Sequence, residues 1–205
     1  MSLKRAIRRM RVRLGPQGPL VLRLHSELEG QLSMEEVRFL LTTARGRRTI
    51  VEIGSFRGKS TVILALGSTD VNGHVTAIDP HIRTAASGTD YGPADLEAFH
   101  GTVDRWAVGD RIEHLTVRSE DARPRWSADR PIDLLWIDGD HTYEGVRRDL
   151  DDWRELVGPS GIIACHDFTH CEGVRRAWEE TVRSATERWT EGRAVRSIVW
   201  ATRVG

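Results

Sequence analysis

Short β-branched segments alternate with amphipathic helical patterns over most of this chain. The first of them, Thr49 to Ile53, is bounded by glycine, which is typical of a buried strand. We expect strands at 49–53, 74–78, 112–117, 132–137 and 161–165, and one or two more within 195–204. We expect helices at 33–45, 61–66, 96–103, 146–157 and 174–182, and the first begins with a capping box of Ser33 and Glu36. Because strands that alternate with helices pair in parallel, the pattern predicts an α/β fold with a doubly wound sheet.

The composition excludes several classes of protein. A chain of 205 residues suits one domain, and 39% hydrophobic residues suffice for a core. The 30 Lys and Arg balance the 30 Asp and Glu, which argues against a globally basic nucleic-acid binder and against an acidic disordered chain. No apolar run reaches the ~18 residues of a membrane span. Cys165 and Cys171 are too few for a disulfide scaffold, and they favour a reducing cytoplasm.

The first 30 residues differ from the rest of the chain. They are basic and contain no acid before Glu27. Residues 3–14 have the spacing of a basic amphipathic helix, and the glycines and prolines of 15–19 predict a break after it. That helix would pack on the domain or a subunit partner, or bind an anionic or membrane surface. We therefore expect a lid-like segment at 1–30 and one main domain at 31–205, with the loop 81–93 as a second candidate lid.

A glycine-rich turn follows the first expected strand. Ligands of such sheets bind beyond the carboxyl ends of the strands. A P-loop needs four residues between its glycines, whereas three separate Gly54 from Gly58. A dinucleotide fingerprint needs glycine where Phe56 stands. The turn of S-adenosylmethionine-dependent methyltransferases needs close backbone approach and an acid at the strand end, which Glu52 supplies. A tight turn that merely requires glycine is the remaining interpretation.

Acidic residues follow the next two expected strands. Asp79 ends the second strand, where a carboxylate accepts both hydroxyls of a ribose. Ser119, Glu120 and Asp121 follow the third strand, where an adenine edge would be recognised.

A second cluster of acids and histidines follows the fourth and fifth strands. Asp138 and Asp167 would face one crevice, where two carboxylates repel each other unless a cation lies between them. A divalent metal resolves that conflict, and His166 would then be a ligand or contact substrate. His141 suits a general base near neutral pH, with Asp140 as the rival base. The structural alternative is that these side chains cap helices and turns.

The motifs at 52–60 and 138–146, together with 161–168, resemble those of class I S-adenosylmethionine-dependent methyltransferases. They are most similar to metal-dependent small-molecule O-methyltransferases of the catechol and bacterial macrolide-sugar types, over residues 33–204. The resemblance implies a Rossmann-like, seven-stranded sheet, mostly parallel, with one antiparallel strand near the C-terminal end. It also implies homo-oligomers, of which a dimer is favoured.

The resemblance implies that Glu52 and Gly54 contact the methionine part of the cofactor S-adenosylmethionine and that Asp79 holds its ribose. Together with the residues found in the turn and at the strand ends, the full set of expected cofactor contacts is Glu52, Gly54, Ser55, Gly58, Ser60, Asp79, Ser119, Glu120, Asp121 and Asp138. A divalent metal, Mg²⁺ or Mn²⁺, is expected at Asp138, His166 and Asp167, and His166 stands where the family usually has a second acid. His141 falls where the catechol type has a lysine base and some sugar enzymes have histidine.

The expected function is methyl transfer to a hydroxyl of a small metabolite, such as a sugar or a natural-product intermediate. Three alternatives stay open. The first is a metal-independent O- or N-methyltransferase. The second is a P-loop-like nucleotide hydrolase, which Lys59 suggests. The third is a binding module without catalysis, although such a module has no need to gather Asp138, His141 and Asp167.

Overall fold

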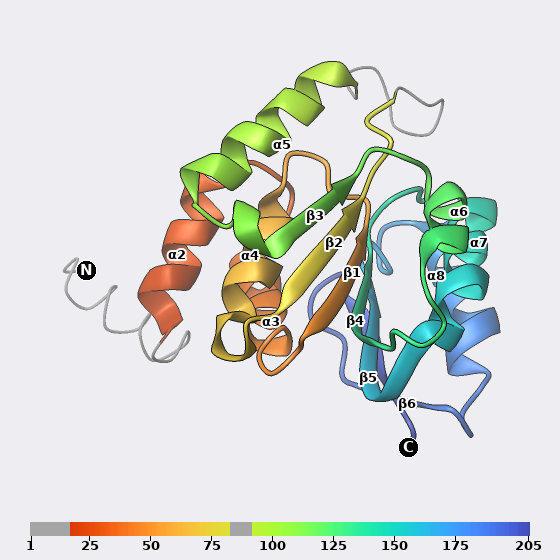
Figure 1. The fold of residues 1–205 in the computed structure, drawn as a ribbon. Helices are drawn as coiled ribbons and strands as arrows, with labels where there is room; N and C mark the ends of the chain where they lie inside the picture. Colours follow the sequence, from red (N-terminus) through yellow and green to blue (C-terminus); the bar gives the residue numbers. More distant parts are fainter. Residues whose placement is uncertain (1–16, 83–91) are drawn as a thin grey trace.

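A single seven-stranded sheet runs through the computed structural model, which describes residues 17–82 and 92–205 (Figure 1). Its strands lie in the order β3-β2-β1-β4-β5-β7-β6. Their bounds are β1 Thr49–Ile53, β2 His74–Ile78, β3 Ile112–Leu115, β4 Ile132–Ile137, β5 Val157–Cys165, β6 Trp189–Glu191 and β7 Val199–Arg203. Strands β1 to β5 pair in parallel, and β7 runs antiparallel to both β5 and β6. The predicted fold class, including one reversed strand near the C-terminal end, is confirmed.

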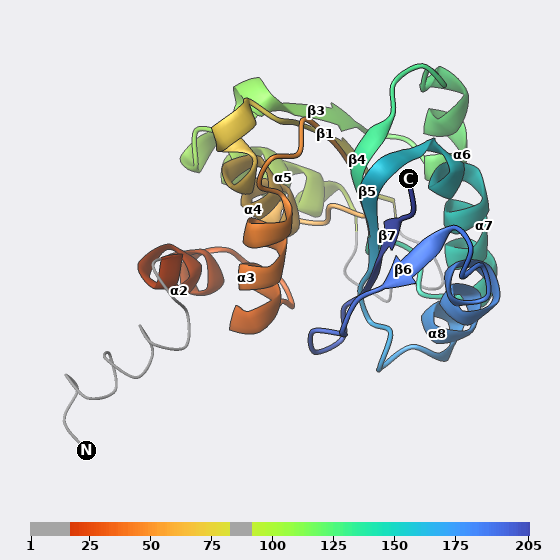
Figure 2. The same cartoon turned by 90° about the horizontal axis from the view of Figure 1, so that it is seen from below.

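Helices cover both faces of the sheet (Figures 1 and 2). One face carries α2 (Gly18–Glu27), α3 (Met34–Thr43), α4 (Lys59–Gly67) and α5 (Pro93–Arg105). The other face carries α6 (Ser119–Ala122), α7 (Tyr143–Trp153) and α8 (Glu172–Trp178). Short 3₁₀ turns lie at η2 Thr69–Val71, η3 Gly109–Arg111, η4 Arg123–Arg125 and η5 Arg154–Leu156, and one π-helical turn, η6 Glu179–Arg183, follows α8.

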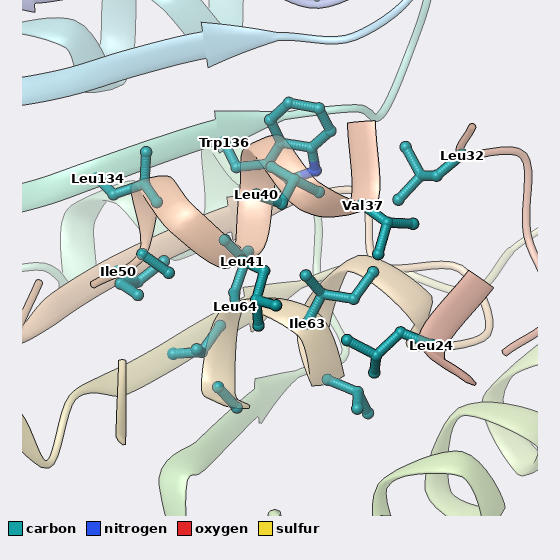
Figure 3. Close-up of a cluster of buried hydrophobic side chains, with 14 of the residues drawn as sticks. Leu24, Leu32, Val37, Leu40, Leu41, Ile50, Ile63, Leu64, Leu134 and Trp136 are labelled. Carbon is teal, nitrogen blue, oxygen red and sulfur yellow. The ribbon is translucent and has the colours of Figure 1, made fainter. Parts of the chain in front are cut away.

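The sheet separates two hydrophobic clusters because successive strand residues point to opposite faces. On β1, Ile50 packs into the cluster beneath α2 to α5, whereas Val51 and Ile53 pack beneath α6 to α8. Figure 3 shows the first cluster, in which Leu24 of α2 lies near Ile63 of α4, and Leu40 of α3 lies near Trp136 of β4. Strands that are buried on both faces require apolar side chains at nearly every position. This requirement explains why the central strands could be predicted from the sequence.

The N-terminal region departs from the sequence-based expectation. A break was expected across 15–19, but α2 begins at Gly18 with Pro19 in its first turn. Proline is accepted there because the first helical N–H groups have no intrahelical acceptor. Val21 and Leu24 are fully buried in the same cluster as α3 and α4. The expected helix at 3–14 and most of the loop 81–93 lie outside the described residues.

The C-terminal strands also differ from the prediction. One or two strands were expected within 195–204, and β7 lies there, whereas β6 precedes that range and was not expected. β6 has three residues, of which Thr190 and Glu191 are exposed. Such a short, exposed edge strand carries no alternating hydrophobic pattern. β5 begins four residues earlier than expected, at Val157.

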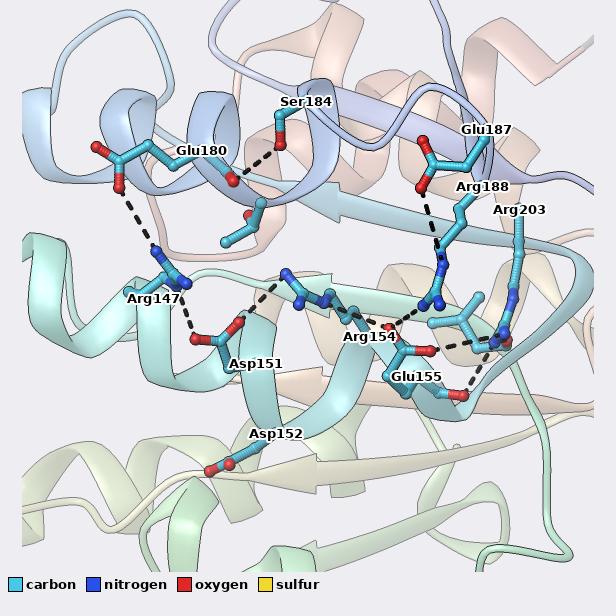
Figure 4. Close-up of polar contacts among 12 residues, drawn as sticks. Arg147, Asp151, Asp152, Arg154, Glu155, Glu180, Ser184, Glu187, Arg188 and Arg203 are labelled. Carbon is cyan, nitrogen blue, oxygen red and sulfur yellow. Dashed lines mark hydrogen bonds and ion pairs between the residues drawn. The ribbon is translucent and has the colours of Figure 1, made fainter.

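A network of ion pairs joins α7 and η5 to η6 and the C-terminal strands (Figure 4). Arg147 pairs with Asp151 and Glu180, and Arg188 pairs with Glu155 across a hollow of about 360 Å³. These groups are 37–54% exposed, so each pair contributes about 0–1 kcal/mol to stability.

Within 17–82 and 92–205, no helix is both long and apolar enough to cross a bilayer.

Candidate active site

A cleft of about 390 Å³ opens beyond the carboxyl ends of β1, β2, β4 and β5. It has the size of a small-molecule site. The residues predicted for the site that line it are Gly54, Ser55, Ser60, Asp79, Ser119, Glu120, Asp138, Asp140, His141, His166 and Asp167. Glu52, Gly58 and Asp121 lie outside its lining. The structure thus brings most of the predicted residues into one cleft.

The glycine-rich turn packs directly against the turn after β4. Gly54 has a φ of +86°, and a Cβ built there would lie 2.3 Å from the carbonyl oxygen of Asp138. The Gly54 N–H donates to the Ile78 carbonyl, and the Asp138 N–H donates to the Ile53 carbonyl, at 2.9 and 2.8 Å. Only glycine combines this backbone conformation with so close an approach. Its role is therefore to hold the ends of β1, β2 and β4 together.

Asp79 organises the same turn. One oxygen of its carboxylate accepts the N–H groups of Ser55 and Phe56, both at 2.9 Å, and the other accepts the N–H of His81 at 2.8 Å. A carboxylate has about four lone-pair sites, so about one is left for a ligand in the cleft. Asp79 is therefore a structural clamp as well as a candidate ribose contact.

Glu52 and Gly58 lie behind the cleft. The Glu52 side chain is fully buried and accepts a hydrogen bond from the Thr61 hydroxyl. Its other oxygen, Oε1, has no hydrogen-bond partner among the described residues. Burial raises the pKa of Glu52 to about 8. Gly58 has a φ of +85°, and a Cβ there would lie 3.2 Å from the Phe99 ring, so this glycine serves the packing of α5.

Ser119 and Glu120 bring α7 to the cleft. The Ser119 hydroxyl donates to Asp149, and Glu120 pairs with Arg148 at 2.9 Å. Asp149 lines the cleft, and burial raises its pKa to about 7. Sequence reasoning missed Asp149. The available signal was an acid three residues after Val146, on the apolar face of the helix. Asp121 is exposed.

Asp138, His166 and Asp167 meet at the ends of β4 and β5. His166 Nδ1 lies 3.2 Å from Asp138 Oδ1 and 3.4 Å from Asp167 Oδ2. These three residues offer ligand atoms within 4.8 Å of one another. Asp167 has a φ of +56°, which is uncommon outside glycine and is found at strained functional positions. The predicted cluster is therefore present as a geometric unit, and its donors could hold a divalent cation.

His141 closes the cluster on the solvent side. Its Nε2 lies 3.5 Å from Asp138 Oδ1 and 3.4 Å from Asp167 Oδ2, and its side chain is 42% exposed. The hydrogen bond to Asp138 raises the pKa of His141 above its usual value. Asp140 is placed differently, because its carboxylate accepts the Thr142 N–H at 2.8 Å and abuts Gly145 at the start of α7.

Glu36 is a member of this cluster that sequence reasoning missed. Its carboxylate lies 3.5 Å from His166 Nε2 and also accepts the Ser197 N–H and hydroxyl. Burial opposes ionisation of Glu36, but the nearby His166 imidazole and hydrogen bonds from Ser197 and Ser33 hold its pKa well below the usual range. Burial lowers the pKa of His166, but its carboxylate partners outweigh burial and raise it to about 12. The capping box explained Glu36 locally and gave no signal of this second contact.

Lys59 and Arg57 hold the end of α2 and the residues that follow it against the cleft. The buried Lys59 ammonium donates to the carbonyls of His25 and Gly30, at 3.3 and 3.0 Å. Arg57 pairs with Glu29, and with the fully buried Asp95 at 2.7 Å. The Lys59 ammonium, which suggested a P-loop, is therefore engaged by protein carbonyls.

Comparisons with known proteins identify the family to which this chain belongs and solved structures with a similar fold. Residues 51–168 match the model of a family described as "Methyltransferase domain". Three solved structures illustrate the fold. The O-methyltransferase TomG of Streptomyces achromogenes, solved with SAM, is 15% identical at a TM-score of 0.64 and covers 91% of this chain and 89% of its own. The O-methyltransferase of Bacillus cereus, solved with SAH, is 18% identical at 0.63, with 90% of each chain covered. The methyltransferase PaMTH1 of Podospora anserina is 16% identical at 0.65, with coverages of 100% and 97%.

A curated relative matches a short part of the chain. It is the uncharacterized protein y4gI of Sinorhizobium fredii, which is 34% identical over 55 residues. That segment is 25% of this chain and 6% of the relative.

Proposed function

The chain belongs to the methyltransferase-domain family, and from this premise we propose that it transfers a methyl group from S-adenosylmethionine to a hydroxyl group of a small metabolite. The observation that carries the proposal is the juxtaposition of Asp138, His141, His166 and Asp167 at one end of the cleft. Transfer to an oxygen requires alignment of the acceptor and removal of its proton. This group of side chains is suited to both tasks.

The remainder of the cleft suits the cofactor, which supplies a methyl group already activated on its sulfonium. Gly54 lines the cleft and lets the turn pack against the Asp138 backbone, and Asp79 keeps about one acceptor position for a ribose hydroxyl. Ser119 and Glu120 would contact the adenine. Glu52 lies directly behind the turn, and its Oε1, which has no hydrogen-bond partner among residues 17–82 and 92–205, would accept from the ammonium group of the methionine part.

The donor set of Asp138, His166 and Asp167 fits a divalent cation, and we propose Mg²⁺ or Mn²⁺. Such a cation lowers the pKa of an acceptor hydroxyl and fixes its position. The carboxylates of Asp138 and Asp167 would hold it, and His166 would complete the set from β5. Glu36 would then orient the far side of the His166 ring.

His141 is the proposed general base. Its Nε2 faces the acidic end of the cleft, and both neighbouring carboxylates stabilise the imidazolium that forms when it takes the acceptor proton. Asp140 is less suited because its carboxylate is engaged by the Thr142 N–H.

A metal-independent methyltransferase is the second candidate, and one observation favours it. The His166 ring already lies between Glu36, Asp138 and Asp167, so a protonated imidazole would neutralise the cluster without a metal. Chelation distinguishes the two. Loss of turnover with excess chelator, restored by Mg²⁺ or Mn²⁺, supports the metal-assisted reaction. Full turnover after chelation supports the metal-independent one.

Thermal unfolding with S-adenosylhomocysteine tests the cofactor, with ATP as the control ligand. A ligand at 100 times its dissociation constant stabilises the folded state by about 2.7 kcal/mol. For a domain of this size the midpoint should rise by roughly 5–11 °C. A rise with ATP alone would refute the proposal and move the search to phosphate chemistry.

The assembly and its location are also proposals. We expect a dimer in the cytoplasm, on the family resemblance and the low cysteine content. Light scattering checks the assembly, and a single species at the chain mass of 23.1 kDa would contradict it.

A further inference from the structure

We propose that His141, Asp167 and Cys171 form a second site in the cleft, which binds a thiophilic divalent ion of the Zn²⁺ type and inhibits the enzyme. Each residue offers one ligand atom, and the three atoms lie within 4.8 Å of one another. The metal-binding group described above uses Asp138 and His166 instead, and shares only Asp167.

The loop after β5 carries the cysteine back to the carboxylate. The N–H groups of His170 and Cys171 both donate to the Asp167 carbonyl, at 3.0 and 2.8 Å. This turn follows the left-handed backbone of Asp167 and ends where α8 begins. The half-buried Cys171 side chain is thereby held beside Asp167 instead of pointing into solvent.

The spacing of the donors suits a tetrahedral ion. Zn²⁺ bonds of about 2.3 Å to sulfur and about 2.0–2.1 Å to nitrogen place ligand atoms roughly 3.3–3.6 Å apart. His141 Nε2 and Asp167 Oδ2 are already 3.4 Å apart. The thiol has to approach them by no more than roughly 1.5 Å. His141 is 42% exposed, which leaves the ion an entry path and a position for water.

The identity of the donors sets the preference for the ion. Thiolate and imidazole select Zn²⁺, Co²⁺ and related ions, whereas Mg²⁺ prefers oxygen ligands. A millimolar excess of Mg²⁺ would therefore leave this site to the softer ion. Binding releases the Cys171 thiol proton to the buffer, because the thiolate is the ligand.

Inhibition follows from the atom that the ion engages. His141 Nε2 is the atom that faces both carboxylates and that takes the acceptor proton in the proposed mechanism. Coordination occupies its lone pair, so the base is lost while the ion is bound. This step rests on the proposed function; the binding of the ion does not.

Cobalt spectroscopy tests the binding. Metal-free full-length protein is titrated with Co²⁺ in excess Mg²⁺, and a thiolate-to-cobalt charge-transfer band in the near ultraviolet is expected at one equivalent. Cys171→Ser should abolish the band and weaken Zn²⁺ at least tenfold in competition with a chromophoric chelator. His170→Ala, which removes a neighbouring exposed histidine outside the triad, should change neither. A missing band in the unmodified protein, or a band that persists in Cys171→Ser, would overturn the proposal.

Turnover tests the inhibition. Zn²⁺ should inhibit methyl transfer reversibly, and Cys171→Ser should raise the inhibitory concentration at least tenfold while basal turnover is kept. Equal inhibition of both proteins would place the inhibitory ion elsewhere and refute this part. The two proposals fail separately. A cobalt band without stabilisation by S-adenosylhomocysteine would refute the proposed function alone, and the reverse result would refute the second site alone.

Discussion

Gly54→Ala and Gly46→Ala form a matched pair that measures how closely the two turns of the cleft pack. Both glycines have left-handed backbone, with φ of +86° and +73°. A Cβ at Gly54 would lie 2.3 Å from the carbonyl oxygen of Asp138, whereas a Cβ at Gly46 would meet nothing within 4 Å. The two substitutions therefore share the backbone cost and differ in the steric cost.

The expected magnitudes follow from these two contributions. Left-handed backbone costs an alanine about 1–2 kcal/mol, which is the whole effect expected for Gly46→Ala. Forced contact in a well-packed region costs about 1–3 kcal/mol more, so Gly54→Ala should lose about 2–5 kcal/mol of unfolding free energy. Urea unfolding at equilibrium measures both. In thermal unfolding the two midpoints should differ by about 2–12 °C, because about 2–4 °C corresponds to 1 kcal/mol at this size.

Ligand binding completes the test. Gly54→Ala should also reduce the stabilisation by S-adenosylhomocysteine, since the displaced neighbour is Asp138, and Gly46→Ala should leave it unchanged. Equal destabilisation by the two variants would refute the close packing of the turns. A destabilised Gly54→Ala that binds the ligand normally would separate this turn from the cofactor site.

Three further predictions address the core, the base and pH. Leu24→Ala should cost about 2–5 kcal/mol in urea unfolding because Leu24 is fully buried, whereas Leu22→Ala, at a side chain that is 40% exposed, should stay within about 0.5 kcal/mol. His141→Asn should lower kcat by about 10²–10⁴ and leave the dissociation constant of S-adenosylhomocysteine unchanged; retained turnover would refute its role as base. Burial and the neighbouring His81 lower the pKa of His114 from 6.5 to about 4. As the pH falls from about 6.5 to 4, His114 is therefore protonated in the unfolded chain before it is protonated in the folded one, and the free energy of unfolding decreases. In urea unfolding measured from pH 7 to 4, His114→Gln should reduce the dependence of the unfolding free energy on pH. An unchanged dependence would contradict the lowered pKa of His114.

The sequence determined the central strands well because their burial leaves little freedom of composition. The expected bounds of β1, β2 and β4 agree with the structure to the residue. β3 ends two residues earlier than expected, at Leu115 on the edge of the sheet, where half-exposed side chains blur the pattern. α2 was missed because Gly18 and Pro19 are read locally as a break, while its anchoring contacts through Leu24 come from tertiary packing.

In the candidate site, the residues at strand ends could be predicted from the sequence, whereas those contributed by helices could not. Ile137 of β4 pairs with Cys165 of β5, so the next residues, Asp138 and His166, lie side by side for a reason that strand order alone provides. Glu36 and Asp149 reach the cluster and the cleft from helices. Their positions depend on how those helices pack on the sheet, which no local spacing specifies.

The strand order has a consequence for how the protein is made. β1 pairs with β4 in the finished sheet, yet roughly 80 residues separate them along the chain. At about 5–20 residues per second, a ribosome needs about 4–16 s to deliver β4 after β1. During that interval the first turn has no Asp138 backbone to pack against, and one edge of β1 is unpaired. The cofactor can therefore stabilise the nascent domain only after β4 has docked beside β1.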